Sequence, residues 1–86
     1  MEFTFSNRFK KEYKTLPEEI KKAVQNKLRM MAENPFHPSL RTKKIQGHEK
    51  ILECSINMAI RMTWEYDGKK IFLRAIGEHD YTLKNP

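Results

Sequence analysis

The second half of the chain alternates apolar and polar residues. Three runs show this pattern: 51–56, 60–66 and 70–76. In the middle run, Met62 and Trp64 share one phase and Arg61 takes the other. Consecutive side chains of a strand point to opposite faces, so each run predicts a strand, and the first two predict strands with one buried and one polar face. Together they predict an antiparallel meander whose polar face carries Arg61, with Trp64 packed in the core.

Short breaks separate the three runs. Residues 57–59 part the first from the second, and Asp67-Gly68 parts the second from the third. Asp-Gly favours a two-residue type I′ turn, because both residues tolerate positive φ. The third run opens with apolar residues on both faces, which suits a central strand. His79 follows just past its end.

The first half of the chain has helical periodicity. Alternation over residues 2–5 predicts a short strand, and the i, i+4 spacing of Phe9 and Tyr13 predicts a helix near 7–15. Apolar residues at helical spacing predict a second helix near 17–33, which Asn34-Pro35 ends. These residues are Ile20, Val24, Leu28 and Met31.

The order of elements predicts an α+β fold. It is β-α-α followed by an antiparallel meander of three to four strands, with both helices packed on one face of an antiparallel sheet that also includes the strand at 2–5. The segment 41–46 could add a further strand. With 86 residues, the chain predicts one domain, 1–86, with a single modest core.

Composition limits the partners and the cellular location that we expect for the protein. The net charge of +6 favours a polyanionic partner, either nucleic acid or an acidic protein segment. No apolar run approaches the roughly 20 residues of a membrane span, and no signal-peptide pattern is present, so we expect a cytoplasmic protein and no membrane partner. The single Cys54 lies in the apolar phase of its strand, which predicts a buried, unreactive thiol.

The candidate functional residues are mainly cationic. The sequence has no Gly-rich phosphate loop and no His/Cys cluster with metal spacing, so we expect neither a cofactor nor a metal. What remains is a set of cations with one late histidine: Arg41, Lys43, Lys44, Arg61, Arg74 and His79. Such a set suits metal-free phosphodiester chemistry, because cations stabilise the charge of the transition state and a histidine moves a proton.

Three segments give the chain a family resemblance. They read Lys-Ile-Gln-Gly at 44–47, Ile-Arg-Met-Thr-Trp at 60–64 and Ile-Gly-Glu-His-Asp at 76–80. Their order resembles the RelE/ParE superfamily of bacterial toxins over essentially the whole chain, and the RelE/YoeB/YafQ-like branch in particular. The resemblance implies the toxin component of a type II toxin–antitoxin system. Such toxins are ribosome-dependent endoribonucleases (mRNA interferases) that inhibit translation, using the 2′-hydroxyl of the RNA and no metal.

The resemblance also implies roles for individual residues. Arg61 matches the family's phosphate-binding arginine, and His79 matches the catalytic histidine of YoeB- and YafQ-like members. Lys43 stands where some relatives have a proton-transfer residue. The paired lysines of RelE are replaced by Leu52 and Cys54.

Several assignments stay open. Lys43, Glu53 and His48 are all candidates for the general base. Arg74 could either lie beside Arg61 on the RNA face or pair with Asp80. We also expect contacts to RNA from these residues: Arg41, Lys44, Arg74 and Tyr81, with Leu83 as an alternative to Tyr81.

The expected partners are mRNA on the ribosome and a cognate RelB-like antitoxin. The antitoxin would dock against the sheet or displace the C-terminal tail, and the two could form a hetero-oligomer. Two other functions compete with the nuclease. One is inhibition of DNA gyrase, as in ParE-like members. The other is a non-catalytic RNA-binding module, which would need exposed aromatic rings among the basic residues.

Overall fold

The computed structural model describes residues 1–86 and contains five strands, three α-helices and one 3₁₀ turn. Their bounds are β1 Glu2–Phe5, α1 Asn7–Lys14, α2 Glu18–Glu33, η1 Pro38–Leu40, β2 Lys43–Lys44, β3 Leu52–Ser55, β4 Ile60–Tyr66, β5 Lys70–Glu78 and α3 His79–Lys84. Each predicted strand and both predicted helices are confirmed, and the segment 41–46 contributes β2. The last strand runs two residues further than expected, to Glu78.

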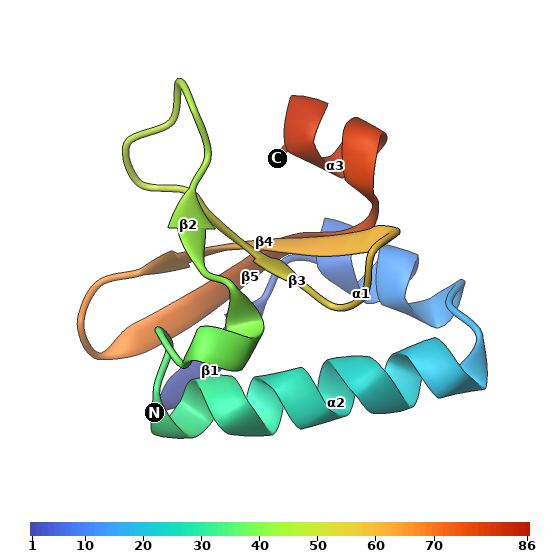
Figure 1. Ribbon diagram of the computed structural model, residues 1–86, viewed down its shortest axis with the longest axis horizontal. Coiled ribbons are helices and arrows are strands. Elements are labelled where there is room, and N and C mark those ends of the chain that lie inside the picture. The colour runs from blue at the N-terminus through green and yellow to red at the C-terminus, as the bar shows by residue number, and fades with distance from the viewer.

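The strands form one sheet in the order β1-β5-β4-β3-β2 (Figure 1). Neighbours from β2 to β5 are antiparallel, as predicted for the meander. The expectation of a wholly antiparallel sheet is wrong at β1, which runs parallel to β5 with Phe3 opposite Ile71. Alternation within residues 2–5 indicates a strand but carries no information on its partner or direction.

The helices lie on both faces of the sheet. Figure 1 shows α2 below the sheet and α3 above it, and α1 packs with α2 against the same core. The two predicted helices thus share one face, whereas α3 is an addition on the other. A Cβ on Gly77 would lie 3.0 Å from Oγ1 of Thr82, so this glycine lets α3 approach β5 closely. None of the helices combines the length and apolarity needed to cross a membrane.

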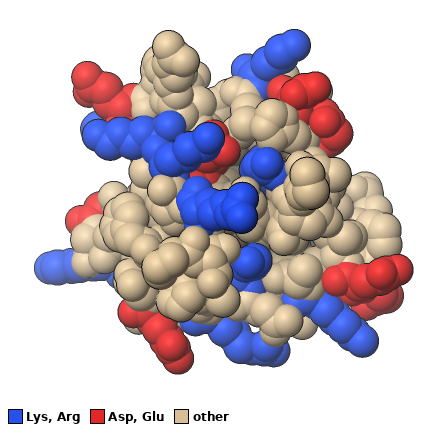
Figure 2. All heavy atoms as spheres, viewed as in Figure 1, with Lys and Arg blue, Asp and Glu red and all other residues tan.

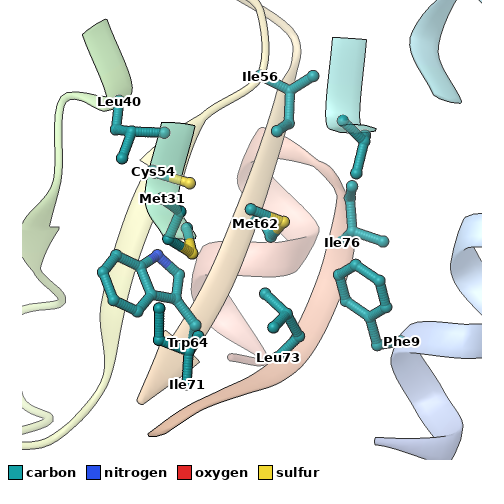
Figure 3. Packing of buried hydrophobic residues seen from close by; sticks show 11 residues of the cluster. Phe9, Met31, Leu40, Cys54, Ile56, Met62, Trp64, Ile71, Leu73 and Ile76 are labelled. Atoms are coloured by element: carbon teal, nitrogen blue, oxygen red, sulfur yellow. The ribbon is translucent and has the colours of Figure 1, made fainter. Parts of the chain in front are cut away.

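The core fills the space between the sheet and the α1–α2 hairpin (Figure 3). Met62 and Trp64 of β4 are fully buried there against Met31 of α2, and Phe9 of α1 packs at the other end of the same cluster. The apolar phase read from the sequence is therefore the buried phase, and Trp64 is a core residue as predicted.

The β4–β5 turn differs from the expected type I′ geometry. Only Gly68 has positive φ, at 98°, so Asp67 does not adopt the left-handed conformation that this turn requires. Instead, Oδ1 of Asp67 accepts main-chain hydrogen bonds from Lys70 (2.7 Å) and Lys69 (2.8 Å). These hydrogen bonds lower the pKa of Asp67, and they hold the turn through the side chain.

The two methionines of the β3–β4 region offer a matched test of the core. Met62 is fully buried, whereas Met58 in the turn is 94% exposed. Met62→Ala should lower the free energy of unfolding by about 2–5 kcal/mol, because it leaves a cavity. Met58→Ala should change it by less than about 0.5 kcal/mol. Urea unfolding followed by circular dichroism measures both, and equal effects would contradict the assigned strand phase.

Candidate functional site

The face of the sheet opposite α1 and α2 carries the polar phase of the meander. Cross-strand pairing sets Glu53 opposite Thr63, and Ser55 opposite Arg61. Figure 1 shows the loop between β2 and β3 rising on the same side as α3, so the two flank this face. The main-chain oxygen of Pro86 accepts a hydrogen bond from Oγ1 of Thr63 at 3.2 Å, so the segment after α3 lies over the sheet.

Arg61 is held in place at one end of this face. Its Nη1 donates to the main-chain oxygens of Asn57 (2.6 Å), Met58 (3.1 Å) and Ile60 (3.2 Å). No hydrogen bond engages Nη2. The side chain is only 16% exposed. A guanidinium fixed in this way loses little further conformational entropy when an anion binds it.

Glu53 supports Arg61 from the neighbouring strand. Its side chain is 8% exposed, and its Oε1 lies 3.9 Å from Nε of Arg61. A buried carboxylate needs a charged or hydrogen-bonding partner, and Arg61 supplies the charge. Lys43 is the residue directly opposite Glu53 in β2. Glu53 therefore stands between the strands that carry Lys43 and Arg61.

His79 lies at the same end of the sheet as Arg61. Its main-chain N–H donates to the oxygen of Ala59 at 2.8 Å, and the β4–β5 register pairs Arg61 with Gly77, two residues before His79. The imidazole is 43% exposed, and its Nδ1 lies 2.9 Å from Oδ1 of Asp80. A hydrogen bond at Nδ1 orients the ring and leaves Nε2 for another partner.

Lys43 and Lys44 point to opposite faces of β2, since Lys43 pairs with Glu53 and Lys44 with Leu52. Both side chains are exposed. They line a hollow of about 780 Å³ near the β4–β5 turn, to which Lys50 also contributes. Lys43 thus reaches the candidate site only by its pairing with Glu53, whereas Lys44 has no such link to it.

Arg74 occupies a β-bulge. Thr63 pairs with Ala75 whereas Trp64 pairs with Leu73, so Arg74 is the extra residue of β5. The guanidinium lies on the polar face, where Nη1 contacts Oε2 of Glu65 at 2.5 Å and Nε donates to the main-chain oxygen of Pro86.

The alternative pairing of Arg74 with Asp80 is wrong, because Asp80 contacts His79 instead. Tyr81, the other expected RNA contact from this end of the chain, is 59% exposed. Its ring centroid lies 5.9 Å from Cζ of Arg8 on α1. It therefore faces the α1 side of the molecule rather than the loop that flanks the polar face.

His48, the third candidate base, lies in that loop. It lines a separate hollow of about 360 Å³ with Glu65 and Arg74, and Arg61 is not part of it. His48 is therefore not grouped with the phosphate-binding candidate. Nowhere do three His, Cys, Asp or Glu side chains gather in a way that could hold a metal ion.

A second group of cations surrounds a hollow of about 600 Å³ beside β3. Arg61 lines it together with Lys27 of α2 and Arg41, which has a left-handed φ of 53° after η1. Arg41 is one of the cations predicted from the sequence, whereas Lys27 is not. A signal was present, since Lys27 lies three residues after Val24 and four before Met31, on the buried side of the helix.

Comparison with solved structures identifies the fold as that of RelE-like toxins. The YoeB dimer from Staphylococcus aureus has a TM-score of 0.80 and 18% identity, covering 92% of this chain and 97% of that chain. YafQ from E. coli has a TM-score of 0.79 and 12% identity, covering 94% and 96%. A chain of the RelB–RelE antitoxin–toxin complex from Methanococcus jannaschii has a TM-score of 0.77 and 20% identity, covering 94% of this chain and 95% of that chain.

These likenesses extend over nearly the full length of each chain. The resemblance to RelE/YoeB/YafQ-like toxins, first indicated by three sequence segments, is thereby confirmed at the level of the fold. No family model matches the sequence, and no curated protein matches it. At identities of 12–20%, the likeness to these structures is one of fold.

Cys54 lies beneath the site and gives a pH-dependent test of its burial. Burial raises the pKa of its thiol from the ordinary 9.0 to about 12, against the lowering effect of the Lys27 and Arg61 charges. Between pH 9 and 12 the unfolded thiol ionises before the folded one, so its stabilising contribution is complete below pH 9 and falls as pH rises.

The free energy of unfolding of the wild type should therefore decrease relative to that of Cys54→Ala across this range. The limiting slope is about 1.4 kcal/mol per pH unit. Denaturant titrations at several pH values measure the difference, in which the other titrating groups cancel. Parallel curves for the two proteins would show that the thiol is not buried.

Proposed function

We propose that the chain is the toxin component of a toxin–antitoxin system and a ribosome-dependent endoribonuclease that cuts mRNA without a metal. The observation that carries the proposal is the fixed guanidinium of Arg61, with His79 at the same end of the polar face. The shared fold with YoeB, YafQ and RelE supports the same class.

In the proposed reaction, Arg61 and His79 have different roles. Arg61 binds the scissile phosphate, with Nη2 available to it, and stabilises the charge that develops on the phosphorus oxygens. The 2′-oxygen of the RNA forms a bond to phosphorus while the bond to the 5′-oxygen breaks. His79, oriented by Asp80, donates a proton to that leaving oxygen. The products are a 2′,3′-cyclic phosphate and a free 5′-hydroxyl.

The 2′-hydroxyl must lose its proton to a base. Lys43 is our candidate, acting either as the base or as a cation that stabilises the developing charge. Its support is its position opposite Glu53, the carboxylate that also pairs with Arg61. Glu53 remains the second candidate, whereas His48 is disfavoured because it lines a different hollow.

We further propose an antitoxin as partner. Seventeen basic residues against eleven acidic ones leave a net charge of +6, which suits an acidic or amphipathic segment that folds as it binds. Similar structures include a YoeB–YefM complex and a RelBE toxin–antitoxin complex, which supports a partner of this kind.

Cleavage by site variants tests the assignment of the two catalytic residues. His79→Ala should cut translated mRNA about 10²–10⁴-fold more slowly, because it removes general acid catalysis, while ribosome binding is retained. Arg61→Ala should weaken both cleavage and binding. His37→Asn is the matched control, since Asn can still accept the hydrogen bond that Nδ1 of His37 takes from the Ser39 N–H. Primer extension with and without ribosomes measures the rates.

The chemistry of the RNA ends provides an independent check. A 5′-phosphate on the products, or cleavage by His79→Ala at the wild-type rate, would contradict the role of His79. Absence of any cleavage together with inhibition of DNA supercoiling by gyrase would instead favour the ParE-like function.

The neighbouring lysines of β2 test the base. Lys43→Gln should slow cleavage by about 10²-fold if the lysine takes the proton. Lys44→Gln removes the same charge from the opposite face of the strand, so its effect should be several-fold at most. Single-turnover rates on ribosomes measure both variants. Equal losses would mean that Lys43 contributes only to the general positive charge.

A further inference from the structure

The hollow beside β3 is a concave site of unbalanced positive charge. β2 pairs only with the first two residues of β3, so the outer edge of β3 is free beyond that point, and two residues of η1 line the hollow beside it. The hollow between them has a volume of about 600 Å³. Its lining contains three cations and no acidic residue: Lys27, Pro38, Ser39, Arg41, Ser55, Ile56, Asn57, Met58 and Arg61.

Two of the three cations have no carboxylate partner. Lys27 and Arg41 form no ion pair, and Arg61 has only Glu53, at 3.9 Å. Lys27 donates one hydrogen bond, to the main-chain oxygen of Ser39 at 3.1 Å, which leaves two of its three donors free. Figure 2 shows one face of the molecule, on which several basic side chains lie near the middle and most acidic ones lie at the rim. A concave wall of one sign concentrates the field and attracts anions.

We infer that this hollow binds a backbone phosphate of the RNA strand, adjacent to the phosphate that Arg61 holds at the cleaved bond. The inference rests on the proposed nuclease function and adds Lys27 and Arg41 to its substrate-binding residues. The strand would then pass from the polar face around the free edge of β3. Arg61 lines both the polar face and the hollow, so it lies between the two phosphates.

The lining favours a phosphate over a base or an acidic peptide. No aromatic ring lines the hollow, so a base has nothing on which to stack. An acidic peptide segment would bring apolar side chains, for which only Ile56, Met58 and the ring of Pro38 are available. The hydroxyls of Ser39 and Ser55 and the amide of Asn57 add neutral donors, which phosphate oxygens accept readily.

Two lysines of α2 allow a matched experiment. Lys27→Gln removes a cation from the hollow, whereas Lys22→Gln removes one from an exposed position of the same helix that lines no hollow described above. The probe is a short RNA in which every 2′-hydroxyl is methylated, so that it binds but cannot be cleaved. Fluorescence anisotropy over a series of salt concentrations gives its affinity, and thermal unfolding checks that both variants are folded.

Lys27→Gln should weaken binding by about tenfold, the size of one charge-assisted hydrogen bond. It should also reduce the slope of log K against log salt by about 0.7, the value for one phosphate contact on a single strand. Lys22→Gln should bind as the wild type does. Equal affinities for the two variants, whether reduced or not, would overturn the inference. So would a Lys27→Gln variant that loses affinity for a poly-glutamate peptide but not for the RNA.

The phosphate site and the nuclease function can be contradicted independently of each other. If Lys27→Gln weakens RNA binding but wild type cuts no mRNA on ribosomes, the phosphate site stands and the nuclease function does not. If wild type cuts mRNA while Lys27→Gln binds and cuts equally well, the nuclease function stands and the hollow is not part of it.

Discussion

The two-faced character of β4 is the constraint on which the rest of the structure depends. Met62 and Trp64 must be buried against the α1–α2 hairpin, and this alone directs Arg61 and Thr63 to the opposite face. A shift of one residue in register would move Arg61 into the core and Trp64 into solvent. The loss of apolar burial and the cost of a buried charge would both oppose that shift, so core packing fixes the position of the candidate site.

The bulge at Arg74 has a different role, because it joins elements on the polar face. As the extra residue of β5, Arg74 lies on the same face as its neighbour Ala75, which pairs with Thr63. Its guanidinium then bridges Glu65 of β4 and the main chain of Pro86. The segment after α3 is thus held over the sheet by a side chain that a regular strand would have placed differently. Any partner that displaces this segment must replace those hydrogen bonds.

Periodicity predicted most of the fold but only part of the site. The phase of β4, the burial of Trp64 and the two helices followed from patterns within single segments. The parallel pairing of Phe3 with Ile71, the bulge at Arg74 and the packing of α3 on Gly77 did not, because each depends on contacts between distant segments. The position of Lys27 on the buried side of α2 follows from helical spacing, but the hollow that it lines does not, because that hollow is formed by elements far apart in the sequence.

The cations of the site differ in how firmly the protein holds them and in how far their charge is balanced. Three main-chain oxygens and Glu53 fix Arg61, so its donors are pre-oriented and its charge is partly balanced. Lys27 and Arg41 carry charge that no carboxylate balances. In the proposed reaction, a pre-oriented group suits the transition state, where geometry decides the rate. Unbalanced charge suits ground-state attraction of the strand, which acts at longer range and weakens with salt. Separating the two tasks lets the protein hold RNA by one set of cations while the other remains aligned for chemistry.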